Sequence, residues 1–271
     1  RSCAIGYDSR IKSEEFAHIT SAIMAENGIH VYLYPVLAPT PMLSFAVRHF
    51  HCGCGVMITA SHNPAKYNGY KVYGEDGCQI TLEAAKKVLG HIEKEKYFDK
   101  EIPDYEKYLN DKVIELIPQE TNDLYEEEVL KVCAGAPQVP IKLVYTPLNG
   151  TGNIPVRHIL DTIGNVEVVV VEEQELPDGN FTTCPYPNPE IPEAMEKAAQ
   201  LAKDTKADLF IATDPDCDRV GVGVIDSNGN TRLFTGNEIG ILLLEYLCTY
   251  RMECGSLPEN PTVVKTIVTT D

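Results

Sequence analysis

Both halves of the chain alternate short apolar stretches of strand length with longer stretches that have the spacing of amphipathic helices. In the first half we expect strands at 2–7, 29–34 and 56–59, separated by helices from Ser13 to Asn27 and from Thr40 to about Gly53. Alternation at this spacing favours parallel strands joined by right-handed crossovers. The fold class is therefore α/β, and ligands should bind where strands end at the carboxyl edge of a sheet.

The second half repeats this pattern, with expected strands at 141–145, 166–171 and 207–212, a hairpin at 220–234 and an amphipathic helix at 236–250. We therefore expect two consecutive α/β domains of similar architecture with mixed or parallel sheets, at 1–136 and 137–260. Residues 261–271 would supply the first strand of a third domain, so we expect a piece of a longer polypeptide. The segment 97–135 should be largely helical, and the proline-rich segment 177–192 should be an extended surface loop.

The charge and the cysteines limit the classes of partner and the cellular location. The net charge of −17 argues against binding to nucleic acid or to anionic membranes. The sequence contains no apolar run of membrane-spanning length and no visible signal peptide. The nine cysteines form no C-x-x-C pair, which is typical of free thiols in a reducing compartment. We therefore expect a cytoplasmic protein.

The first polar cluster follows the expected strand at 56–59. Ser61 lies just beyond the strand end, and Lys71 follows ten positions later, after an Asn68-Gly69 turn. A serine held at a strand end is suited to be a nucleophile or the carrier of a transferable group.

The second polar cluster contains three alternating aspartates, Asp214, Asp216 and Asp218, directly after an apolar strand. Converging carboxylates repel one another and require a cation, and oxygen ligands favour Mg²⁺ or Ca²⁺ over zinc. An EF-hand is excluded, because Arg219 and Ile225 occupy the positions that need glycine and glutamate. A solvated acidic turn is the other interpretation, which the preceding buried strand disfavours. Arg219 would be a natural contact for an anion beside the metal.

The two clusters suggest a joint function in phosphoryl transfer. Three aspartates leave an octahedral Mg²⁺ short of ligands, and a phosphoryl group on Ser61 would supply another oxygen. Metal and basic side chains would then neutralise the charge of the transferred group. The glycine-rich segment 146–152 lacks the spacing of a phosphate-binding loop, and we interpret its glycines as allowing a tight turn.

Several segments resemble the α-D-phosphohexomutases, the phosphoglucomutase/phosphomannomutase family. They are 7–10 (Y-D-S-R), 59–64 (T-A-S-H-N-P), 68–71 (N-G-Y-K), 146–152 (T-P-L-N-G-T-G), 177–181 (P-D-G-N-F) and 214–219 (D-P-D-C-D-R). The family has four domains, and this chain resembles the first two. The loops that recognise the sugar and the non-transferred phosphate in domains 3 and 4 are absent, so we expect no turnover by this chain alone.

The resemblance implies an isomerase of carbohydrate metabolism, an intramolecular phosphotransferase that interconverts hexose 1- and 6-phosphates. Ser61 would carry the phosphoryl group, hexose 1,6-bisphosphate would be intermediate and activator, and the missing C-terminal domains would complete the site. His62 and Lys71 are the acid–base candidates, with Lys71 favoured for the proton and His62 for orientation. The implied metal ligands are Ser61, Asp214, Asp216 and Asp218, with Mg²⁺ as the ion, and the implied substrate contacts are Arg10, Asn63 and Arg219.

Alternatives to this function remain at the level of sequence. Glucose is the first expectation for the sugar and mannose the second, and a phosphopentomutase or a phosphoglucosamine mutase would share the same motifs. An enzyme with an aspartyl nucleophile, like the haloacid dehalogenase-like phosphatases, is a rival. The acidic loop of that class lies near the N-terminus, however, whereas the aspartate cluster of this chain lies late in the sequence. A non-catalytic metal-binding module is the other rival.

Overall fold

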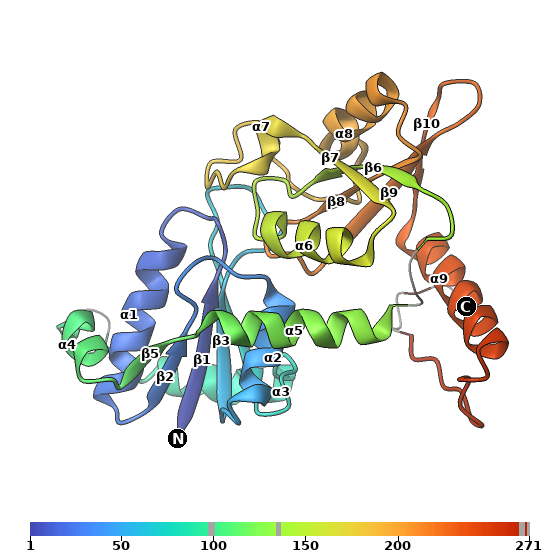
Figure 1. The fold of residues 1–271 in the computed structure, drawn as a ribbon. Coiled ribbons are helices and arrows are strands. Elements are labelled where there is room, and N and C mark those ends of the chain that lie inside the picture. Colours follow the sequence, from blue (N-terminus) through green and yellow to red (C-terminus); the bar gives the residue numbers. More distant parts are fainter. Residues whose placement is uncertain (97–100, 134–136, 266–268, 270–271) are drawn as a thin grey trace.

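The computed structural model describes residues 1–96, 101–133, 137–265 and 269, which form two α/β domains (Figure 1). Each domain is built on a five-stranded mixed sheet. The strands of the first sheet lie within residues 2–116 and those of the second within 141–234. The expected domain boundary, at residue 136, lies outside the described residues.

The first sheet has the order β4-β3-β1-β2-β5. Its strands are β1 (Ser2–Tyr7), β2 (His30–Leu33), β3 (Cys54–Ile58), β4 (Tyr70–Gly74) and β5 (Ile114–Leu116). All neighbours pair in parallel except β3 and β4. Helices α1 (Ser13–Glu26) and α2 (Thr40–His49) pack on opposite faces, because Ile5 and Ala4 of β1 belong to different hydrophobic clusters with α1 and α2 respectively. The remaining helices are α3 (Leu82–Ile92), α4 (Tyr105–Asn110) and α5 (Gln119–Val132).

The expectation of a largely helical segment at 97–135 was incomplete, because β5 joins the edge of the sheet there. Ile114 of β5 pairs with Val31 of β2 and is buried. The strand has three residues and only one of them is buried, so it leaves almost no alternating pattern in the sequence. Residues 97–100 and 134–136 of this segment lie outside the described residues.

The second sheet has the order β10-β9-β8-β6-β7 and ends in an antiparallel hairpin. Its strands are β6 (Ile141–Thr146), β7 (Val166–Val170), β8 (Leu209–Thr213), β9 (Val220–Ile225) and β10 (Thr231–Phe234). Helix α8 (Pro192–Thr205) contributes Met195 and several alanines to a core around Phe210 of β8. Helix α6 (Asn153–Ile163) follows β6, and the short α7 (Glu172–Glu175) follows β7.

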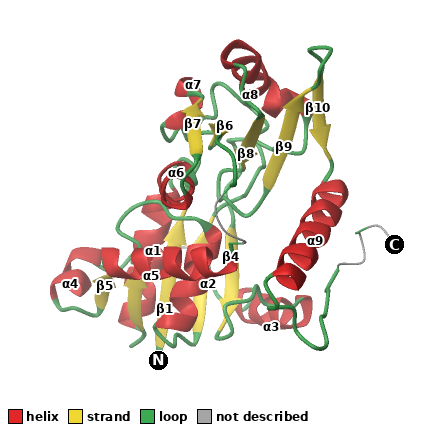
Figure 2. Ribbon diagram, turned by 45° about the vertical axis from the view of Figure 1, so that its right-hand side comes forward, coloured by secondary structure: helices red, strands yellow, loops and turns green. Residues whose placement is uncertain are grey.

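Helix α9 (Gly236–Glu253) begins with a capping box made by Thr235 and Glu238. The helix was expected, but its apolar side chains are not buried: Leu242 and Leu243 are each more than half exposed, and the helix stands apart from both sheets (Figure 2). No helix in the described part of the chain is both long and apolar enough to cross a membrane. Residues 261–265 and 269 form no strand, and the rest of the segment expected to supply a strand, 266–268 and 270–271, lies outside the described residues.

The proline-rich segment 177–192 is more than the surface loop that was expected, because part of it packs against domain 1. Phe181 is fully buried, and the guanidinium of Arg10 lies 4.9 Å from the centre of its ring. Gly179 lies so close to domain 1 that an added Cβ would be 2.7 Å from the amide nitrogen of Ile11 and 2.9 Å from the carbonyl oxygen of Ser9. The loop therefore helps to fix the position of one domain against the other.

We expect Gly179→Ala to weaken this contact, because its methyl group would meet backbone atoms that cannot rotate away. The free energy of unfolding should fall by about 1 to 3 kcal/mol, the usual range for overpacking. Urea denaturation of the two proteins measures the difference. The matched control is Gly90→Ala in α3, where a Cβ would meet nothing within 4 Å; this variant should gain up to about 1 kcal/mol from the higher helix propensity of alanine.

Candidate functional site

Two loops at the carboxyl ends of strands, one from each domain, meet at the candidate site. Ser61 follows β3 of the first sheet, and Asp214 follows β8 of the second. The Ser61 hydroxyl donates a hydrogen bond to Asp214 Oδ2 at 2.8 Å, although the two residues are 153 positions apart in the chain. The structure thus brings together the two clusters that the sequence marked separately.

Ser61 has a left-handed backbone conformation, with φ of 52°. This conformation costs a residue other than glycine about 1 to 2 kcal/mol, so surrounding contacts must hold it. Its amide donates to Thr59 Oγ1 at 2.8 Å, and its carbonyl oxygen accepts from Arg10. His62 Nδ1 lies 3.2 Å from Ser61 Oγ, within reach of the atom that would carry a transferred group.

Arg10 acts here as a clamp for the loop that carries Ser61. Its side chain is buried, and its terminal nitrogens donate to four backbone carbonyl oxygens of this loop, those of Ser61, Asn63, Pro64 and Tyr67. In the structure the guanidinium of Arg10 already donates to these carbonyl oxygens. Its expected contact with a phosphoryl group or substrate therefore stays a prediction. Asn63 likewise contributes its carbonyl oxygen to the clamp, while its side chain is exposed.

Asp8 forms an ion pair with Arg10 and so holds this clamp in place. It is buried, its Oδ2 lies 3.2 Å from Arg10 Nε, and it accepts hydrogen bonds from Thr59 Oγ1 at 2.6 Å and Ser13 Oγ at 2.7 Å. Burial raises the pKa of Asp8, and these donors together with Arg10 oppose that shift. Ser13 was expected to begin α1, and it does, but its hydroxyl serves Asp8, while the preceding Lys12 has a left-handed conformation without a side-chain cap.

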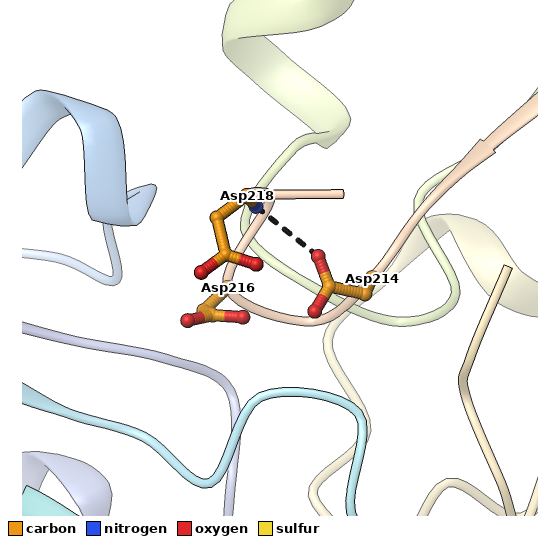
Figure 3. A group of neighbouring side chains, drawn as sticks. All are labelled: Asp214, Asp216 and Asp218. Carbon is orange, nitrogen blue, oxygen red and sulfur yellow. Dashed lines mark hydrogen bonds between the residues drawn. The ribbon is translucent and has the colours of Figure 1, made fainter. Parts of the chain in front are cut away.

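The three aspartates of the second loop turn their carboxylates toward one another (Figure 3). One oxygen from each lies within 4.8 Å of the others. Asp214 and Asp216 are buried, and Asp218 is exposed. Asp214 Oδ1 accepts the backbone N–H groups of Asp218 at 3.1 Å and Arg219 at 3.0 Å, which wraps the loop around this carboxylate.

The two carboxylate oxygens of Asp216 differ in their hydrogen bonds. Its Oδ2 accepts from Lys71 Nζ at 2.7 Å and from Thr40 Oγ1 at 2.8 Å, both residues of domain 1. Its Oδ1 is buried without a hydrogen-bond partner in the structure. A buried carboxylate oxygen without a partner is costly unless a cation completes it. Asp214, Asp216 and Asp218 offer only oxygen ligands, so the group fits Mg²⁺.

The neighbouring charges of the cluster shift one another's pKa values. Burial, together with the neighbouring Asp216, raises the pKa of Asp214 to about 8. Burial opposes ionisation of Asp216 as well, but the ion pair with Lys71 outweighs it and lowers the pKa of this carboxyl. Burial alone would lower the pKa of Lys71, but Asp216 and Asp218 raise it, so its ammonium is protonated at neutral pH. Burial and then Arg219 lower the pKa of His62, which favours a neutral imidazole.

Arg219 lies at the rim of the site. Its backbone N–H serves Asp214, and its guanidinium pairs with Glu190 at 2.9 Å, with the side chain partly exposed. This surface ion pair is weak and can be exchanged for another anion. Arg219 is therefore available for a phosphate, as the sequence indicated, although no contact in the structure tests that role.

The glycine-rich turn at 146–152 packs closely against the loop that carries the three aspartates. A Cβ on Gly150 would lie 2.5 Å from Pro215 Cα, and one on Gly152 would lie 2.6 Å from Thr213 Oγ1. This close approach agrees with the structural interpretation of these glycines. Sequence reasoning missed Thr40 as part of the site, and it gave Asp8 no role of its own, although it singled out the segment 7–10. Asp8 could have been found from its place beside Arg10 at a strand end, whereas Thr40 gave no signal beyond opening a helix.

We expect the raised pKa of Asp214 to make the metal-free chain less stable as the pH rises. Between 3.8, the ordinary pKa of an aspartate, and about 8, the folded chain holds a proton on Asp214 that the unfolded chain has released. The free energy of unfolding therefore falls with increasing pH in this window. Urea denaturation with EDTA from pH 5 to pH 8 measures this slope.

The matched variant is Asp214→Asn, which cannot titrate and should lack this component of the slope. Mg²⁺ should also suppress it in the parent chain, because the ion binds the ionised carboxylate. Equal slopes for the two proteins in EDTA would contradict the assignment of the proton to Asp214.

The comparisons with known proteins agree with the two-domain arrangement. The sequence profile described as "Phosphoglucomutase/phosphomannomutase, alpha/beta/alpha domain I" matches residues 1–99, and that of domain II matches residues 123–229. A phosphoglucomutase of Staphylococcus haemolyticus is 41% identical over 98% of this chain and 48% of its own length. A phosphoglucomutase of Staphylococcus aureus (strain USA300) is 39% identical over 89% of this chain and 44% of its own. The chain thus spans about half the length of these relatives.

Solved structures show the same fold. A Thermus thermophilus protein, provisionally described as a phosphomannomutase, superposes with a TM-score of 0.70 at 27% identity, over 94% of this chain and 53% of its own. A Burkholderia thailandensis protein of the phosphoglucomutase/phosphomannomutase family superposes with a TM-score of 0.70 at 21% identity, over 92% of this chain and 51% of its own, which shows likeness of fold alone.

Proposed function

Because this chain belongs to the phosphoglucomutase/phosphomannomutase family, we propose that it is the phosphoserine- and metal-bearing half of a phosphohexomutase, an intramolecular phosphotransferase. The observation that carries the proposal is the 2.8 Å hydrogen bond from Ser61 Oγ to Asp214 Oδ2 across the domain boundary. It places a hydroxyl that can accept a phosphoryl group beside a cluster that can hold a divalent cation.

The reaction moves a phosphoryl group from Ser61 to a free hydroxyl of a hexose phosphate and back from the other end of the bisphosphate. In the first transfer the Oγ–P bond breaks while the sugar oxygen bonds to phosphorus. The sugar hydroxyl loses a proton and Ser61 Oγ gains one, and the second transfer reverses both changes. The charge on the transferred group stays distributed over its oxygens, so positioning and electrostatics carry most of the catalysis.

Lys71 and His62 divide the supporting tasks. The raised pKa of Lys71 keeps it protonated, so it acts first as a positive charge beside the phosphoryl group. It is also the proposed proton donor, although the same shift makes its ammonium a weaker acid. His62, with its lowered pKa and its Nδ1 3.2 Å from Ser61 Oγ, orients that oxygen. Arg219 would bind an oxygen of the phosphoryl group or of the substrate.

Asp214, Asp216 and Asp218 would hold Mg²⁺, and a phosphoryl group on Ser61 would add one further oxygen ligand. When bound, the cation neutralises charge on the phosphoryl group during transfer. The free Oδ1 of Asp216 and the position of Asp214 between the loops support this assignment.

The substrate proposed is a hexose phosphate, glucose first because the relatives named above are phosphoglucomutases, and mannose second. A phosphopentomutase or phosphoglucosamine mutase would use the same half-site. Because the relatives are about twice as long, we propose that their other half supplies sugar recognition and that this chain does not turn over by itself. Activation by hexose 1,6-bisphosphate and a cytoplasmic location belong to the same proposal.

We expect one phosphoryl group on Ser61 after the full-length protein is incubated with glucose 1,6-bisphosphate and Mg²⁺. Intact mass followed by peptide mapping detects it, and Ser61→Ala should remove it and lower turnover by at least about 10³-fold, the loss typical of removing a group that forms the covalent intermediate. The matched control is Ser9→Ala, another serine at a strand end. A folded protein that gains no phosphoryl group would refute the mutase function and favour a metal-binding module. A phosphoryl group on an aspartate would favour the aspartyl mechanism instead.

A further inference from the structure

Thr40 lies at the first position of α2 in domain 1, yet it makes two hydrogen bonds to Asp216 of the proposed metal loop, residues 214–219 of domain 2, besides a side-chain contact with Tyr73 of its own domain. Its hydroxyl donates to Asp216 Oδ2 at 2.8 Å, and its backbone N–H donates to the Asp216 carbonyl oxygen at 2.8 Å. Both side chains are buried, and the two residues are 176 positions apart in sequence.

These contacts also complete the start of α2. The residue before the helix is Pro39, which provides no side-chain cap, and the first turn contains no acidic residue. The amide groups of a helix N-terminus need acceptors, and the helix dipole favours negative charge there. Asp216 supplies both, so the helix and the metal loop stabilise each other across the domain boundary.

We propose that Thr40 is a positioning residue for the cation site: its hydroxyl fixes the plane of the Asp216 carboxylate so that Oδ1 faces the cation. The inference rests on the proposed metal site. With Oδ2 held by Thr40 on one side and Lys71 on the other, rotation of the carboxylate would break two hydrogen bonds in a buried environment.

Lys71 by itself does not fix this plane, because its ammonium is shared with Asp218, which it pairs with at 3.2 Å. Removal of the Thr40 hydroxyl would leave Asp216 Oδ2 with one donor, which Asp218 shares. The carboxylate could then turn toward Lys71 with both oxygens, which would withdraw Oδ1 from the cation. The Thr40 hydroxyl thus prevents Lys71 from binding both oxygens of Asp216.

The experiment is a calorimetric titration of Mg²⁺ into this 271-residue chain and its variants. We expect Thr40→Val, which keeps the shape of the side chain but removes the hydroxyl, to weaken Mg²⁺ binding about 10- to 100-fold, as is usual when a metal-ligating side chain loses its hydrogen-bond partner. Thr40→Ser keeps the hydroxyl and should stay within about threefold of the parent on the same basis. Thr20→Val, a buried threonine of α1 on the other face of the sheet, should bind like the parent.

The outcomes separate the inference from its premise. If the parent chain binds no Mg²⁺, the proposed metal site is wrong and the inference falls with it. If the parent binds and Thr40→Val binds equally well, the metal site stands and the role of Thr40 is overturned. The ranking parent, Thr40→Ser, Thr40→Val supports the role, because a merely structural effect would lower the unfolding temperature without ordering the affinities in this way.

A second measurement uses the parent chain alone, in case Thr40→Val does not fold. In a ¹⁵N-resolved NMR titration with Mg²⁺, the amide of Thr40 should shift together with those of the metal loop, since it is bonded directly to the Asp216 carbonyl. A Thr40 amide that stays fixed while the amide of Asp218 shifts would overturn the proposal.

Discussion

The site depends on the hydrogen bonds that the buried carboxylate of Asp216 accepts from Lys71 and Thr40. This carboxylate belongs to domain 2, yet both donors to its Oδ2 belong to domain 1. A buried charge is tolerated only when it is paired and hydrogen-bonded, so the two domains must meet closely around it. Asp214 adds a second hydrogen bond between the domains, which it accepts from Ser61. Gly179 and Phe181 of domain 2 also pack against domain 1. In a chain with a net charge of −17, Lys71 places a positive charge beside two of the three clustered aspartates.

A second constraint acts within the loop of Ser61. The left-handed backbone of this serine is possible because Arg10 binds the loop carbonyls and Thr59 binds the amide. Arg10 is held in turn by Asp8, so a chain of contacts runs from the end of β1 to the Ser61 backbone. These contacts hold the Ser61 backbone in place, and Asp214 and His62 contact its hydroxyl, so the hydroxyl is positioned as the transfer of a group between fixed partners requires.

Much of the fold could be predicted from sequence because its signals are local. The strands before Ser61 and before Asp214 follow from their apolar runs and their turn residues, and the two polar clusters stand at their ends. β5 was missed because it has three residues and gains its stability from Val31 of another strand. The bond between Thr40 and Asp216 could not be predicted from either segment alone, because it joins residues of different domains. The clamp by Arg10 depends on backbone carbonyls, which any loop sequence provides.

The dependence of α2 on Asp216 has a consequence for biosynthesis. A ribosome completes residues 40–49 long before residue 216 emerges, and domains generally fold in the order in which they are made. During that interval the start of α2 lacks its acceptor and Lys71 lacks its carboxylate partner. The contacts of Ser61, Thr40 and Lys71 with the aspartates therefore form only when the second domain docks, so the nascent first domain presents its serine loop without the three carboxylates. The assembly of the two domains is itself the step that matures the site.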